Sequence, residues 1–298
     1  MKHAACAGTK VSIASTAGFC FGVRRAINLA EETAKGKNKI YTFGPLIHNP
    51  QEVERLDRRG IKAVESVSRL KNVTLILRTH GIPARLRQKL KSGGLHLVDA
   101  TCPFVKRAQD IVWKLAKKKR QVLIVGDKTH PEVVALVSYA GDNFNVVEKK
   151  SDIKKLVLSD HVGVVSQTTQ TPENFNDIIE CVRLKRPGAE IYNTICRATI
   201  DRQADAQRLA KKVDVMIVVG GKNSGNTRRL FEICRRYTRA YAVETADEIN
   251  SRWFRNVMSC GVTAGASTPD WIIRDIKSKV ESIATCGGKT NGRSKAKQ

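Results

Sequence analysis

Three cysteines occupy equivalent places in a repeated pattern, and they are the side chains best suited to carry chemistry. Cys20, Cys102 and Cys196 each stand just ahead of a stretch with helical spacing of apolar residues. A helix start lowers the pKa of a thiol and favours a metal-bound thiolate. Three thiolates can hold zinc with a fourth ligand, or an iron–sulfur cluster with one iron left free. The CxxC spacings of ferredoxins and zinc ribbons are missing, so spacing alone leaves the metal open. For the other five cysteines we expect only packing roles.

A polar residue follows each of these cysteines at the same distance of 28 positions, in a glycine turn after a short apolar strand. A second strand of each unit ends near another polar residue, which we take as a second set of equivalent positions. The two sets are His48, His130 and Ser224, and His80, Thr168 and Ser267. Neutral donors and imidazoles at helix starts suit a compact, doubly charged anion, for which diphosphate is the natural candidate. The chain has no Walker A motif and no GxGxxG after a strand, so we expect electrons to arrive from another protein.

One acidic residue, Glu132, lies two positions after His130. A glutamate at a helix start is commonly a complement to the helix dipole. The alternative is a proton donor held in a dry pocket. Both interpretations remain open from the residues alone.

The elements that position these residues recur three times. Each cysteine is followed by a helix, a strand with its glycine turn, a second helix, and a second strand that ends near a proline. Three matched spacings predict a triplicated α/β unit. We therefore expect three similar lobes with mostly parallel sheets, in pseudo-threefold arrangement around a central site that holds either zinc or an iron–sulfur cluster. Their predicted ranges are 11–98, 99–193 and 194–284, followed by a basic, disordered tail at 285–298.

The composition adds a strong positive charge. The 298 residues include 53 Lys and Arg against 28 Asp and Glu, which gives a net charge of +25. Such an excess attracts polyanions, so a nucleic-acid-binding protein with structural metal is one alternative. Only 5% of the residues are aromatic and no nucleic-acid motif is present, which argues against nucleic acid as the partner. No apolar run reaches membrane-spanning or signal-peptide length, so we expect a cytoplasmic protein with reduced thiols and no membrane partner.

Several motifs together resemble the 4-hydroxy-3-methylbut-2-enyl diphosphate reductase (LytB) family, in order from about residue 11 to residue 280. The motifs are Gly18-Phe19-Cys20, Gly44-Pro45-Leu46-Ile47-His48-Asn49, Arg78-Thr79-His80-Gly81, Asp99-Ala100-Thr101-Cys102-Pro103, Gly126-Asp127-Lys128-Thr129-His130-Pro131-Glu132, Gln167-Thr168-Thr169, Lys222-Asn223-Ser224 with Asn226, and Gly261-Val262-Thr263-Ala264-Gly265-Ala266-Ser267. The resemblance implies reductive dehydroxylation of that diphosphate to isopentenyl and dimethylallyl diphosphates, the last step of the non-mevalonate isoprenoid pathway. A metal-dependent hydratase acting on a diphosphate is the alternative enzyme.

The resemblance also implies a cofactor and roles for individual residues. It implies a [4Fe-4S] cluster on Cys20, Cys102 and Cys196 with one iron open to substrate, and a ferredoxin or flavodoxin as electron donor. Glu132 would supply protons, and Thr168 would orient the substrate hydroxyl. The implied substrate contacts are His48, His80, His130, Thr168, Ser224, Gly225, Asn226 and Ser267. Gly225 stands where many members have a second serine, so its backbone N–H remains but a hydroxyl donor is lost.

Overall fold

The computed structural model describes residues 9–36, 39–68, 70–222 and 224–286. The chain divides into two compact units. The central unit comprises residues 20–200. The terminal unit combines the described residues before position 20 with those after position 200.

Each unit is built on parallel sheets of four strands. The central unit contains two, with strand orders β3-β2-β4-β5 and β7-β6-β8-β9, and the terminal unit contains one, with the order β1-β12-β10-β11. The strands are β1 (Lys10–Ile13), β2 (Ile40–Phe43), β3 (Ile61–Val64), β4 (Thr74–Leu77), β5 (His96–Asp99), β6 (Gln121–Val125), β7 (Phe144–Val147), β8 (Val162–Ser166), β9 (Glu190–Tyr192), β10 (Val215–Val219), β11 (Arg239–Val243) and β12 (Ser259–Ala264). All observed strand pairings are parallel. The predicted α/β class with three similar lobes is confirmed.

The N-terminal strand takes part in the last sheet. β1 pairs with β12, with Val11 opposite Cys260, and so occupies the place that β5 and β9 hold in the other two sheets. The strand before each of the three cysteines is therefore always an edge strand. The lobe boundaries at 98/99 and 193/194 stay a prediction. Residues 287–298 of the predicted tail lie outside the described residues.

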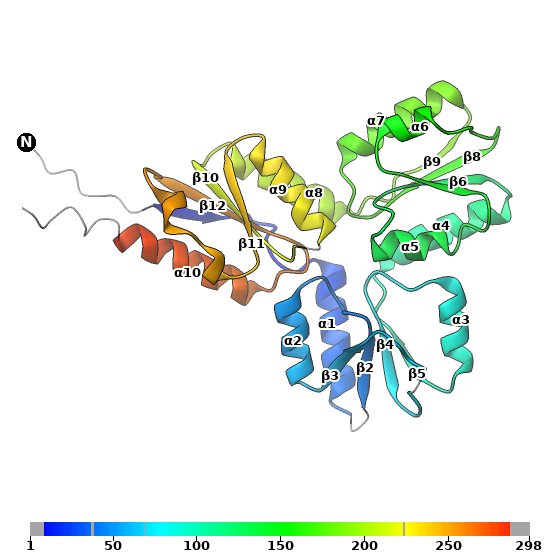
Figure 1. Ribbon diagram of the computed structural model, residues 1–298, viewed down its shortest axis with the longest axis horizontal. Helices are drawn as coiled ribbons and strands as arrows, with labels where there is room; N and C mark the ends of the chain where they lie inside the picture. The colour runs from blue at the N-terminus through cyan, green and yellow to red at the C-terminus, as the bar shows by residue number, and fades with distance from the viewer. Residues whose placement is uncertain (1–8, 37–38, 69, 223, 287–298) are drawn as a thin grey trace, which may run out of the picture. The chain divides into compact units, whose positions relative to one another are not determined.

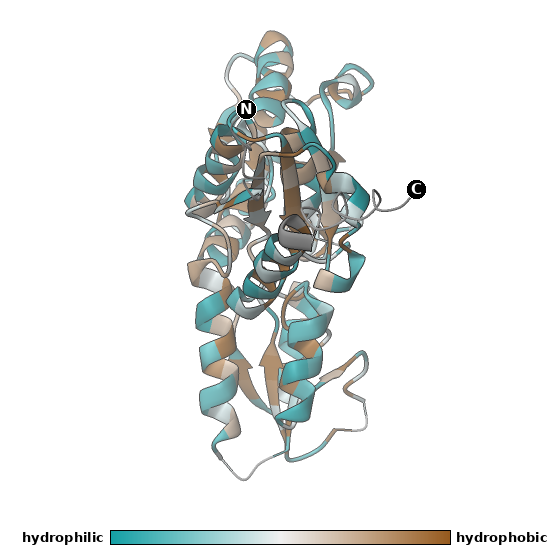
Figure 2. Cartoon of the chain, turned by 90° about the vertical axis from the view of Figure 1, so that its left-hand side faces the viewer, coloured by the Kyte–Doolittle hydropathy of each residue, from teal (hydrophilic) through white to brown (hydrophobic). Residues whose placement is uncertain are grey.

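Helices cover the sheets on both faces, as parallel strands require. They are α1 (Phe21–Ala34), α2 (Pro50–Arg58), α3 (Ala84–Ser92), α4 (Pro103–Lys117), α5 (Pro131–Val137), α6 (Lys150–Lys154), α7 (Pro172–Lys185), α8 (Arg197–Ala210), α9 (Gly225–Arg235) and α10 (Asp270–Cys286), with 3₁₀ turns η1 (Ala246–Glu248) and η2 (Ser251–Phe254). On the sheet of β6 and β8, α4 and α5 pack against one face, and α6 and α7 against the other (Figure 1). Figure 2 shows the apolar strands between helices of mixed polarity. None of the described helices combines the length and apolar character needed to span a bilayer.

The helix starts follow their sequence signals. Pro50, Pro103 and Pro131 each occupy the first position of a helix, where the missing N–H costs nothing. The predicted apolar stripes of α1 and α4 are buried. These helix starts matter for function because each one lies within two residues of a candidate site residue, which is His48, Cys102 or His130.

Candidate active site

The three cysteines all stand at helix starts of the central unit. Cys20 is the N-cap of α1, and Cys102 is the N-cap of α4. Cys196 precedes α8, and its carbonyl accepts the N–H groups of Thr199 at 2.8 Å and Ile200 at 3.2 Å. All three side chains are half-buried and unpaired in disulfides.

Gly22 brings two of these cysteines together. A Cβ added at Gly22 would lie 2.5 Å from the Sγ of Cys102 and 4.0 Å from the Sγ of Cys20. The start of α1 therefore lies directly against the Cys102 thiol, and only a glycine fits there. Cys196 is close enough to Cys20 for the two to interact electrostatically. The structure thus brings the three predicted ligands together.

The thiol pKa values correct the sequence prediction. Burial raises the pKa of Cys102 to about 11; the backbone amides of Phe104 and Val105 lower it, and nearby Cys20 contributes to the increase. Burial likewise raises the pKa of Cys196. The helix starts do favour the thiolates as expected, but the loss of hydration outweighs them. Such thiols ionise at neutral pH when a cation compensates their charge, as a bound metal does.

Two of the cysteines are tied through their backbones to the loops that carry other candidate residues. The N–H of Cys102 donates to the carbonyl of Thr79 at 3.0 Å, and the N–H of Cys196 donates to the carbonyl of Thr168 at 2.9 Å. A displacement of either loop would therefore move a thiol.

The hydrogen bonds and strand ends also change the predicted equivalence of the repeats. Counted from the last paired residues of β4 and β8, Leu77 and Ser166, Thr168 corresponds to Thr79. The sequence prediction that equated Thr168 with His80 was one residue off, because both the strand end and the following proline (Pro83 and Pro172) stand at the same distances from Thr79 and from Thr168.

Three histidines from three different turns form a cluster. His48 follows β2, His80 follows β4, and His130 caps α5. The ring centroids of His48 and His80 are 4.2 Å apart, and His130 lies 5.3 Å and 5.4 Å from them. Their nitrogen atoms fall within 4.8 Å of one another.

Burial favours the neutral form of two members of this cluster, His48 and His80. It lowers the pKa of His80 well below the usual value, helped by His48, His130 and Arg78. Burial and Arg78 also lower the pKa of His48. The Nδ1 atom of His130 accepts the N–H of Glu132 at 3.2 Å, which assigns its proton to Nε2. A neutral cluster offers N–H donors to an anion and becomes cationic most readily when that anion is present.

Glu132 and Thr168 make a buried pair beside this cluster. The carboxylate accepts the backbone N–H of Thr168 at 2.6 Å and its hydroxyl at 2.7 Å. Glu132 is 1% exposed and Thr168 is 5% exposed. Glu132 does lie in the first turn of α5, but Thr168 binds both of its oxygens. The carboxylate is thus positioned rather than merely complementing a dipole.

The remaining predicted residues belong to the terminal unit. Ser224 caps α9 and accepts the N–H of Thr227 at 3.3 Å. Gly225 opens α9, and the buried side-chain amide of Asn226 makes no hydrogen bond within the part of the chain that the structure describes. Ser267 follows β12 and is half-buried. An amide buried without a partner is costly, and a polar ligand would satisfy it.

Two charged residues of α8 were not identified from the sequence. The Oδ2 atom of Asp205 accepts from the Ser15 hydroxyl at 2.9 Å and from the Thr16 N–H at 2.9 Å. Arg202 is 3% exposed and donates to the carbonyl of Gly18 at 2.6 Å. They hold the loop that leads to Cys20. The sequence signal that could have identified Arg202 and Asp205 is that both charged residues fall on the inward face of an amphipathic helix.

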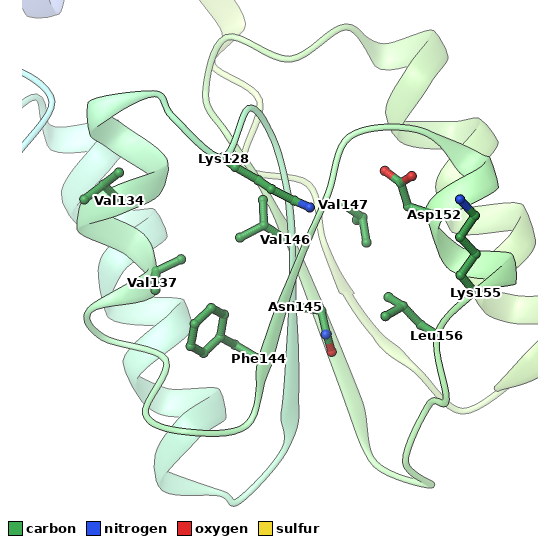
Figure 3. Close-up of a pocket in the computed structure, with 10 residues that line it drawn as sticks. All are labelled: Lys128, Val134, Val137, Phe144, Asn145, Val146, Val147, Asp152, Lys155 and Leu156. Carbon is green, nitrogen blue, oxygen red and sulfur yellow. The ribbon is translucent and has the colours of Figure 1, made fainter.

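A groove of about 650 Å³ lies elsewhere, beside the edge strand β7 (Figure 3). Apolar side chains from β7 and α5 line it, with Lys128, Asp152 and Lys155 at its margins. None of the predicted site residues lines this groove, so it is distinct from the cysteine and histidine clusters.

Comparison with known proteins decides the family. Residues 11–281 match the family model described as LytB protein. The chain belongs to the LytB protein family. This confirms the resemblance found in the sequence. The LytB chain is 45% identical over 278 residues to the 4-hydroxy-3-methylbut-2-enyl diphosphate reductase of Aquifex aeolicus (strain VF5), covering 92% of this chain and 96% of the relative. It is 47% identical over 277 residues to the enzyme of that name in Trichlorobacter lovleyi, with 92% and 98% covered.

Solved structures give the same assignment for this LytB chain. One of (E)-4-hydroxy-3-methyl-but-2-enyl diphosphate reductase, described as the terminal enzyme of the non-mevalonate pathway, superimposes with a TM-score of 0.69 at 44% identity, covering 92% of this chain and 99% of the other. The E-1-hydroxy-2-methyl-but-2-enyl-4-diphosphate reductase of Plasmodium falciparum gives a TM-score of 0.87 at 29% identity, with 91% and 87% covered. The fold is shared along almost the entire chain.

Proposed function

We propose that this chain is a 4-hydroxy-3-methylbut-2-enyl diphosphate reductase, an oxidoreductase that completes the non-mevalonate isoprenoid pathway. The substrate gains two electrons and two protons, its allylic C–O bond breaks, and isopentenyl or dimethylallyl diphosphate leaves with one water. The observation that carries this proposal is the near-complete coverage of reductases at about 45% identity.

The three cysteines fit an iron–sulfur cofactor. Three thiols meet without disulfides, two of them have raised pKa values, and Gly22 leaves space where a side chain would collide. We assign Cys20, Cys102 and Cys196 as the ligands of a [4Fe-4S] cluster with one iron open to substrate. When bound, that cluster supplies the electrons and a Lewis-acidic iron.

The histidine cluster supports diphosphate binding. His48, His80 and His130 provide N–H donors on three separate turns, and the amide dipoles at the starts of α2 and α5 add to them. Ser224, the backbone N–H of Gly225, Asn226 and Ser267 of the terminal unit are proposed as further substrate contacts, on the ground that the buried amide of Asn226 has no hydrogen-bond partner among the described residues. The positive charge that a diphosphate attracts can come from protonation of the histidines on binding.

The Glu132–Thr168 pair supports proton delivery. With Glu132 ionised, the Thr168 hydroxyl donates to it at 2.7 Å. With Glu132 protonated, the same contact reverses, because Oε2–H then donates to the Thr168 oxygen. The Thr168 hydroxyl proton is then directed to the substrate hydroxyl, which leaves as water. Burial of both residues keeps bulk water from competing for this proton.

A small electron carrier, either a ferredoxin or a flavodoxin, is proposed as the redox partner in the cytoplasm.

An anaerobic assay of reconstituted protein with the diphosphate substrate and reduced methyl viologen tests the function. We expect substrate-dependent viologen oxidation and isopentenyl and dimethylallyl diphosphates as products. Glu132→Gln should lower kcat by about 10²-fold or more, the range of general acid catalysis. Glu54→Gln, an exposed carboxylate change on α2, should leave kcat unchanged. Turnover without reductant would indicate a hydratase instead.

A further inference from the structure

The three helices that start at the cysteines share a charge pattern. α1, α4 and α8 have no acidic residue in their first turns, as is also true of α3 and α9, whereas α2, α5, α6, α7 and α10 each have one. Acidic residues are ordinarily favourable at that position because they complement the helix dipole. These three helix starts instead carry arginines in or next to the first turn, including Arg24 on α1 and Arg197 on α8. A positively charged side chain therefore lies within five positions of each of the three cysteines.

Exposed aromatic rings stand at two of the same helix starts. Phe21 is 65% exposed and directly follows Cys20, and Phe104 is 39% exposed and lies two residues after Cys102. The chain has eight phenylalanines, all within the described ranges, and these two alone are exposed. A large apolar side chain kept in water beside a functional centre is typical of a binding surface.

The two helix starts lie side by side within the central unit. Gly22 of α1 lies against the Cys102 thiol at the start of α4, so Phe21 and Phe104 stand on neighbouring helix ends. One turn further along each helix, Arg24 and Arg107 are also exposed. These four residues, Phe21, Arg24, Phe104 and Arg107, are named the α1/α4 face.

We propose that the α1/α4 face is the docking surface for an acidic, one-electron carrier protein. This inference rests on the proposed reductase function. Arginines around two aromatic rings match a partner with acidic residues around an apolar contact, because charge complementarity directs the encounter and the rings provide anchoring area. Electrons entering here reach Cys20 or Cys102 through at most two residues of backbone. Each carrier gives up one electron, so two carriers are oxidised for each substrate molecule. The substrate takes up these two electrons with two protons and releases one water.

Matched charge-reversal variants test this surface. The first is the double variant Arg24→Glu with Arg107→Glu. The control is Lys114→Glu with Lys117→Glu, an identical change in charge at exposed positions near the other end of α4. That end is roughly 18–22 Å from Cys102 at 1.5 Å per residue. The Phe21→Ser variant removes one ring without changing charge.

The probe is a plant-type [2Fe–2S] ferredoxin, with its Kd measured by calorimetry on both oxidised proteins at low and high salt. We expect the Arg24/Arg107 variant to weaken Kd at least tenfold and Phe21→Ser at least threefold, with the lysine control within a factor of two. Ferredoxin-driven turnover should fall in parallel, while viologen-driven turnover stays unchanged. Added salt should weaken the wild-type complex.

Other outcomes separate the two levels of the proposal. If the lysine control weakens Kd as much as the arginine variant, or neither does, the docking surface is wrong while the reductase function stands. If wild-type protein shows no viologen-driven turnover, the reductase function itself fails. Tighter binding of the wild type to random duplex DNA than to ferredoxin, lost in the arginine variant, would overturn the protein partner in favour of nucleic acid.

Discussion

Replacing Gly22 by alanine separates helix propensity from the geometry of the cysteine cluster. Alanine is favoured over glycine inside a helix by about 1 kcal/mol, so propensity alone predicts a stabilised protein. The new Cβ, however, would lie 2.5 Å from the Cys102 Sγ, more than 1 Å closer than the ordinary contact distance of about 3.5–4.0 Å between carbon atoms. A free thiol can rotate away from this collision, but a thiol that ligates a cluster cannot.

The overpacking cost therefore falls on the cluster-bound protein. At about 1–3 kcal/mol, it corresponds to a roughly five- to 150-fold loss of cluster retention. In protein prepared without the cluster, we expect the free energy of unfolding to rise by no more than about 1 kcal/mol, because the free thiol rotates away and only the helix propensity of alanine remains. Retention is measured from iron and sulfide content and from the rate at which a chelator bleaches the absorbance at about 400 nm.

The matched control is Gly188→Ala, because a Cβ at Gly188 meets nothing within 4 Å. It should retain the cluster as the wild type does. Wild-type retention in Gly22→Ala would show that Cys102 is not held in place as a ligand, and would refute the reasoning. Equal losses in both variants would indicate a general effect of alanine substitution.

Three further perturbations test the residues around the site. Thr168→Val removes the hydroxyl that binds Glu132 and should lower kcat about tenfold or more, since a hydrogen bond to a charged group contributes about 1.5–3 kcal/mol. Thr168→Ser keeps a hydroxyl and should retain most activity. Equal kcat values for the two variants would contradict proton transfer through the Thr168 hydroxyl. The pKa of His80 is lowered in the folded protein, so the unfolded protein binds more protons below pH 6.5 and the free energy of unfolding should fall as the pH drops below 6.5. In His80→Asn this fall should be less steep, by up to about 1.4 kcal/mol per pH unit. Urea unfolding of cluster-free wild type and variant measures the two pH profiles, and parallel profiles would refute this reasoning. Asp205→Leu frees the loop before Cys20 and should speed chelator-driven iron loss, whereas loss at the wild-type rate would show that the loop needs no such anchor.

Much of the fold could be predicted because its signals are local. Helix starts at Pro50, Pro103 and Pro131 and the apolar stripe of α1 follow from residue types a few positions apart. The constant spacing between each cysteine and the polar turn residue also predicted three repeated α/β units. Each of these patterns depends on neighbours along the chain, so no knowledge of distant contacts was needed.

The features that the sequence could not predict depend on distant contacts. The pairing of β1 with β12 joins residues almost 250 positions apart, and no local pattern marks it. The pKa of Cys102 depends on how deeply the assembled helices bury it, which outweighs the favourable helix start. The hydrogen bonds that Ser15 and Thr16 donate to Asp205 likewise form only after α8 has packed against the loop before Cys20.

The central claim is a two-electron reduction by a protein whose three cysteines hold an iron–sulfur cluster. Its most direct test is the electron stoichiometry, measured anaerobically with a limiting amount of the diphosphate substrate and excess reduced methyl viologen. The account predicts two viologen cations oxidised for each diphosphate product, no product without reductant, and no product from Cys102→Ser protein. Product formation without viologen oxidation, or undiminished turnover in Cys102→Ser, would contradict it.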